Sequence, residues 1–144
     1  MHSNSQWIWF ALGSAFFAAL TALLGKLGVG GINSNLATLL RCVVIVALTA
    51  GIISWRGEWQ RPDHVSLSSW IYIVLSAIAT GLSWLCYYRA LQLGPVSKVA
   101  PVDKLSVALA MLLGVVVLGE KLTLPVALGG ALILAGSLVI ICAP

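Results

Sequence analysis

The feature that most constrains this chain is its division into five long apolar blocks, separated by short polar breaks. Hydrophobic residues make up 60% of the 144 residues, charged residues make up 8%, and the mean hydropathy is +1.05. Soluble proteins carry about 25% charged residues. A β-barrel would need polar and apolar residues to alternate along strands of roughly ten residues, whereas these blocks are apolar on every face. We therefore expect an all-α polytopic membrane protein with five transmembrane helices in contact with the lipid bilayer.

The polar breaks set the bounds of the expected helices within a single membrane domain, residues 1–144. The helices are predicted at about residues 7–27, 33–55, 68–91, 96–118 and 123–141. We expect no cleavable signal peptide, because the N-terminal residues lack a basic region and the first apolar block is too long. In the last helix, Gly129 and Gly130 accompany alanines that recur every four residues. Small residues of this kind suit helix pairing, within one subunit or between two.

The fourth predicted helix is unusual because its first half is polar and its second half is not. Lys98, Asp103 and Lys104 surround Pro101, whereas residues 105–119 carry no charge. Ionisable residues inside a membrane helix are costly and by default indicate a functional site. Proline removes a backbone hydrogen bond and leaves a carbonyl that needs another donor. We therefore predict that this helix is kinked or broken and lines a polar cavity, and of the two we expect a kink near Pro101.

The second predicted helix carries Arg41, eight residues past Asn33. At a rise of 1.5 Å per residue, that position lies ~12 Å along the helix. Asp103 lies eight residues past Pro95 in a helix that crosses in the same direction, so we expect Arg41 and Asp103 at similar depth. Either they neutralise each other and the other cations reach toward headgroups, or the excess of cations attracts an anionic or zwitterionic solute while Asp103 exchanges a proton.

Aromatic residues gather near the end of the third predicted helix, at Trp84, Tyr87 and Tyr88. They are typical of an interfacial belt, and they are also typical of a binding cavity. The candidate residues for a substrate and coupling cavity are therefore Arg41, Asp103, Lys104, Tyr87, Tyr88 and Trp84.

The remaining charges exclude some functions and leave the membrane orientation open. The formal net charge of +4 gives no contiguous basic stripe, so nucleic-acid binding is excluded as an interpretation. The three cysteines show no metal-ligand spacing, and we expect no metal or cofactor. Basic residues in loops and helix ends number three on each side, which permits insertion in both orientations. The two sets are Lys26, Arg89 and Lys98 on one side, and Arg56, Arg61 and Lys121 on the other.

Three features occur in a characteristic order along the chain. The first is Arg41 in the second predicted helix, and the other two are the stretches Ser83–Val107 (SWLCYYRALQLGPVSKVAPVDKLSV) and Leu118–Gly136 (LGEKLTLPVALGGALILAG). In this order the chain resembles, over nearly its whole length, the EamA domain of the drug/metabolite transporter superfamily. The resemblance implies a five-helix unit that many members carry twice as inverted repeats. It also implies a helix-end or interhelical contact for Glu120. The related small multidrug resistance proteins rely on a glutamate in the first helix, and this chain has none there.

Taken together, these features predict a secondary transporter of a small organic metabolite or drug-like solute in a bacterial inner membrane. A single copy implies a dimer that works by alternating access, either an antiparallel homodimer or a pair with a second similar chain. Proton coupling through Asp103 is part of this hypothesis. The alternative is a non-transporting assembly partner or a lipid-carrier flippase subunit. We expect no enzyme activity, because the sequence has no metal cluster, nucleophile elbow or catalytic carboxylate pair.

Overall fold

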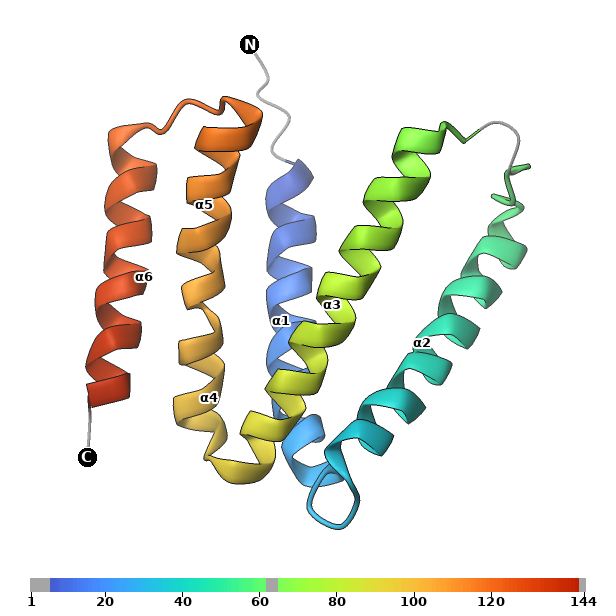
Figure 1. The fold of residues 1–144 in the computed structure, drawn as a ribbon, viewed down its shortest axis with the longest axis horizontal. Helices are drawn as coiled ribbons and strands as arrows, with labels where there is room; N and C mark the ends of the chain where they lie inside the picture. The colour runs from blue at the N-terminus through green and yellow to red at the C-terminus, as the bar shows by residue number, and fades with distance from the viewer. Residues whose placement is uncertain (1–5, 62–64, 143–144) are drawn as a thin grey trace. The chain divides into compact units, whose positions relative to one another are not determined.

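The computed structural model describes residues 6–61 and 65–142, and its elements are all helices (Figure 1). They are α1 (Gln6–Gly28), α2 (Ser34–Arg56), α3 (Leu67–Leu93), α4 (Val96–Asp103), α5 (Leu105–Leu118) and α6 (Leu124–Cys142). Because α4 and α5 together form one apolar span, Val96–Leu118, the described residues contain five spans long and apolar enough to cross a membrane. The predicted all-α class with five transmembrane helices is confirmed.

The helices belong to two compact units, which are described separately. The first unit contains α1 up to Leu23 together with α4, α5 and α6, and the second unit runs from Leu24 to Gln92. The second unit therefore contains the last turn of α1, all of α2 and nearly all of α3. Large apolar side chains are exposed along α1, α2, α3, α5 and α6, as expected for helices that are apolar all round and meet lipid.

In the first unit, α6 packs against α4 and α5 (Figure 1). Gly130 of α6 is buried, and a Cβ atom there would lie 2.8 Å from both Sδ and Cε of Met111 in α5. The absence of a side chain at Gly130 thus lets Met111 approach the backbone of α6. The neighbouring Gly129 has open space around it. Close packing over a small residue is the usual way in which membrane helices associate.

The predicted kink near Pro101 is not confirmed, because the fourth helix bends by only 4°. The helix is instead interrupted at Lys104, whose N–H donates to the Pro101 carbonyl at 3.0 Å, three residues back. The ring of a proline crowds the carbonyl four residues earlier, which here is Ser97. Ser97 lies in the first turn of α4, just after the Gly94–Pro95 turn. The backbone there can adjust without redirecting the rest of the helix.

In the second unit, hydrogen bonds join the ends of α1 and α3 to the turn that precedes α2. The side-chain amide of Gln92 donates to the carbonyls of Val29 at 3.2 Å and Ile32 at 2.8 Å. Nζ of Lys26 donates to the carbonyl of Leu91, which is fully buried. The last carbonyls of a helix lack partners within the helix, so the bond from Lys26 satisfies the carbonyl of Leu91. The bonds from Gln92 tie the end of α3 to the turn after α1.

Candidate functional site

The central feature of the second unit is a contact between Arg41 of α2 and two aromatic rings of α3. Cζ of Arg41 lies 4.2 Å from the ring centroid of Trp84 and 5.5 Å from that of Tyr88. Trp84 and Tyr88 are four residues apart, so they lie on the same face of α3. Cations are attracted to the faces of aromatic rings at such distances. The structure therefore brings three of the predicted site residues together.

The ring of Tyr88 packs against the end of α1. Tyr88 is 6% exposed, and a Cβ atom at Gly25 would lie 3.3 Å from its hydroxyl oxygen. A side chain at Gly25 would therefore press on Tyr88, and the glycine makes room for the phenol. Tyr87 contacts Tyr88 edge to face, with ring centroids 6.4 Å apart. Of the two rings beside Arg41, that of Tyr88 is thus supported by α1 and by Tyr87.

The charge of Arg41 is not matched by a carboxylate within the described part of its own unit. The carboxylate described there, Glu58, pairs with Arg56 at 2.8 Å near the other end of α2. Arg41 itself is partly buried and faces rings rather than acids. An arginine within a membrane helix is costly unless water, an anion or a carboxylate reaches it.

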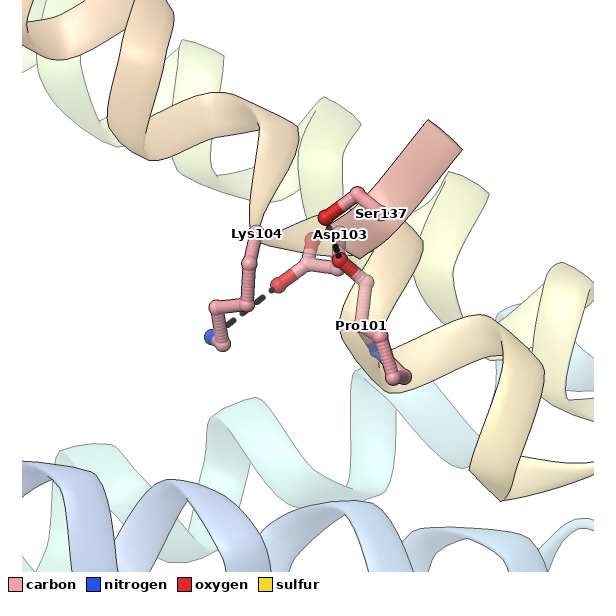
Figure 2. Close-up of polar contacts among 4 residues, drawn as sticks. All are labelled: Pro101, Asp103, Lys104 and Ser137. Atoms are coloured by element: carbon pink, nitrogen blue, oxygen red, sulfur yellow. Dashed lines mark hydrogen bonds and ion pairs between the residues drawn. The ribbon is translucent and has the colours of Figure 1, made fainter. Parts of the chain in front are cut away.

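A second polar cluster lies in the first unit, at the interruption between α4 and α5 (Figure 2). Nζ of Lys104 lies 3.3 Å from Oδ2 of Asp103, and the two side chains are 52% and 36% exposed. Oγ of Ser137 in α6 donates to the Pro101 carbonyl at 2.9 Å. The interruption thus gathers an ion pair and an interhelical hydrogen bond within one part of the first unit.

Arg41 and the pair Asp103–Lys104 belong to different units. Their predicted common depth, their shared cavity and the pairing of Arg41 with Asp103 stay predictions. In its own unit, each group has a different partner: aromatic rings for Arg41 and a neighbouring lysine for Asp103.

Glu120 lies directly after the C-terminal cap of α5. Its backbone N–H donates to the carbonyl of Gly114 at 3.1 Å, and Gly119 adopts a left-handed conformation with φ of 69°. The carboxylate folds back over α5, since a Cβ atom at Gly114 would lie 2.8 Å from Oε2. The structure therefore places Glu120 at a helix end, in contact with its own helix.

One cavity involves residues that were not among the predicted site residues. It has a volume of about 240 Å³ and is lined by Lys26, Val29, Gly30 and Gln92. Gln92 was recognisable in the sequence as a polar residue at the end of an apolar helix, and Gly30 as part of a glycine-rich turn. Neither pattern predicts a hydrogen bond between residues 60 positions apart, such as that from Gln92 to Ile32. Among residues 6–61 and 65–142, no cluster of His, Cys, Asp and Glu could hold a metal ion.

Comparison with known proteins decides the family. The chain matches the EamA-like transporter family over residues 5–142. It belongs to this family. A relative from Sinorhizobium sp., named "Uncharacterized transporter in cobO 3'region", is 49% identical over 137 residues, which cover 95% of this chain and 97% of the relative. No solved structure matches the chain. With five apolar spans among its described residues, this EamA-like protein is a multi-pass membrane transporter, and its family points away from an enzyme.

Proposed function

We propose that this EamA-like protein is a secondary transporter that moves a small organic solute across a bacterial inner membrane. The observation that carries the proposal is Arg41, a permanent charge within a membrane span that rests on aromatic rings. A transporter needs polar groups at membrane depth, because its solute must exchange water for protein contacts there. Asp103 and Lys104 offer further polar groups at the interruption of the fourth span.

The proposed transporter works as a dimer by alternating access. Transporters are commonly built from two repeats with the binding site at their interface near the midplane, and residues 6–61 and 65–142 contain one set of five spans. The equal number of basic residues on the two sides of the predicted topology supports insertion in both orientations. A second copy, or a similar chain, would then supply the other half.

Reconstitution of the purified chain into liposomes tests the proposal. We expect gradient-dependent uptake from a panel of small organic anions, zwitterions and cations, at a rate above that of liposomes without protein. If no solute of the panel is taken up, and the chain copurifies from native membranes with another membrane protein, it is an assembly partner or flippase subunit and the proposal is wrong.

The same liposomes test the role of Asp103. If Asp103 exchanges a proton during transport, a proton gradient drives uptake by the native chain, and Asp103→Asn removes this drive while the protein still inserts. Lys104→Gln is the matched variant, because it removes the partner of Asp103 without removing the proton-binding group. Full proton-driven uptake by Asp103→Asn would eliminate Asp103 from the coupling mechanism.

A further inference from the structure

The guanidinium of Arg41 is oriented by its neighbours and retains hydrogen-bond donors that its own unit does not use. The rings of Trp84 and Tyr88 lie at 4.2 Å and 5.5 Å from Cζ. Aromatic rings attract the cation, but they do not satisfy the five N–H groups of a guanidinium. Within the described part of the second unit, no residue accepts a hydrogen bond from Arg41, and Glu58 is engaged by Arg56.

The unused donors have a geometry that selects a particular acceptor. A guanidinium is planar, and its N–H groups point outward in that plane as a fork that matches two oxygen atoms of one carboxylate or phosphate. Attraction to an aromatic ring does not use these N–H groups. Neutral carbonyl or hydroxyl groups would satisfy the donors less well, because they do not balance the charge in a medium of low dielectric.

The surroundings of Arg41 are also fixed before any ligand arrives. Tyr88 is nearly buried against Gly25, and Leu91 is fully buried. The end of α3 is tied to α1 and to the following turn through Lys26 and Gln92. A group that is already ordered loses little conformational entropy when it binds, which favours affinity.

We infer that Arg41 binds the carboxylate or phosphate group of the transported solute, so that the substrates are small organic anions or zwitterions that carry such a group. This assignment rests on the transporter function proposed above. It names the side chain that recognises the solute and the chemical group that the side chain recognises. It also gives Trp84 and Tyr88 a reason to lie against Arg41, since their rings attract the guanidinium without accepting hydrogen bonds from its N–H groups.

Protection of Arg41 from phenylglyoxal, a reagent that modifies guanidinium groups, tests this inference on the native chain. The purified protein in dodecyl maltoside would be labelled at constant ionic strength, and each arginine would be quantified by mass spectrometry. The probes are sodium benzoate, inorganic phosphate, the neutral analogue benzamide, and dioleoyl phosphatidic acid as a lipid source of phosphate. Arg56, on the same helix and 63% exposed in its side chain, is the internal control.

We expect benzoate or inorganic phosphate to slow the labelling of Arg41 about tenfold when the probe is present at about nine times its dissociation constant. Benzamide should leave the rate unchanged, and none of the probes should protect Arg56. Equal labelling of Arg41 with and without the anions would overturn the inference, and so would equal protection of Arg41 and Arg56. Protection by phosphatidic acid alone would assign the site to a lipid headgroup and overturn the assignment to a solute.

The labelling experiment needs no gradient and no flux, so its result is independent of the liposome assay. Protection of Arg41 without uptake of any solute would leave an oxyanion site in a protein that does not transport. Uptake without protection would leave a transporter whose solute is recognised elsewhere, and would contradict the role given to Arg41.

Discussion

Arg41→Gln should lower the uptake of organic anions by the reconstituted protein by at least about tenfold, while the variant still inserts and purifies. Hydrogen bonds that involve a charged group are worth about 1.5–3 kcal/mol, and each 1.4 kcal/mol is a factor of about ten in binding. Glutamine keeps much of the length of arginine and removes its charge and its fork of donors. The initial rate of uptake measures the effect, with protein orientation and density checked in the same liposomes.

Two further variants separate the charge of Arg41 from its geometry. Arg41→Lys keeps the charge but loses the planar fork, so we expect uptake between that of the native chain and that of Arg41→Gln. Arg56→Gln removes an arginine from the same helix whose partner is the exposed Glu58, and it should leave uptake unchanged. If Arg41→Gln transports at the native rate, or if Arg56→Gln is equally impaired, Arg41 has no special role.

Gly130→Leu should destabilise the folded protein by about 1–3 kcal/mol, the usual cost of inserting extra carbon atoms into a packed site. Even a single Cβ atom at this position would lie 2.8 Å from Sδ and Cε of Met111. Met111 is flexible and could move away from one added carbon, but a leucine requires α6 to move away from α5. The free energy of unfolding in mixed micelles measures the effect.

Gly129→Leu is the matched control, because it changes the same residue type in the same helix at a position with open space. It gains the same intrinsic helix propensity without a clash, so it should not reduce stability. If both variants have the same unfolding free energy, the close approach of Met111 to Gly130 is not a constraint on packing.

Hydropathy predicted the number of membrane spans because the free energy of inserting a helix into the bilayer depends on the summed hydropathy of a whole block of sequence. Twenty or so apolar residues cross a bilayer whatever their exact neighbours are, and the described part of the chain contains five such spans. The kink at Pro101 was predicted from a rule about single residues, and it is not confirmed, because the fourth helix bends by only 4°. A proline removes a hydrogen bond, but whether the helix then bends depends on where the backbone can adjust.

The contacts within the candidate site could be predicted only in part from the sequence. Trp84 and Tyr88 are four residues apart, so their common face on α3 followed from helical spacing. That Arg41 faces them depends on the rotation of α2 about its axis, which the apolar pattern does not fix because this helix is apolar around its circumference. Likewise, the two adjacent glycines of α6 look equivalent in the sequence, and only the position of Met111 distinguishes them.

Water access to position 41 is the most direct test of the central claim that a solute reaches this point in the membrane. Arg41→Cys would be placed in a chain whose three cysteines, Cys42, Cys86 and Cys142, are replaced by alanine. A membrane-impermeant methanethiosulfonate reagent reacts with thiolates, which form only where water is present. Val43→Cys, two residues further along α2 and turned to the opposite face, is the comparison position.

We predict that the reagent modifies Arg41→Cys from at least one side of the membrane and leaves Val43→Cys unmodified. The protein should be in native lipid during the reaction, because detergent could admit water that the membrane excludes. If Arg41→Cys is as unreactive as Val43→Cys from both sides, position 41 is sealed from water and the proposed solute site is contradicted.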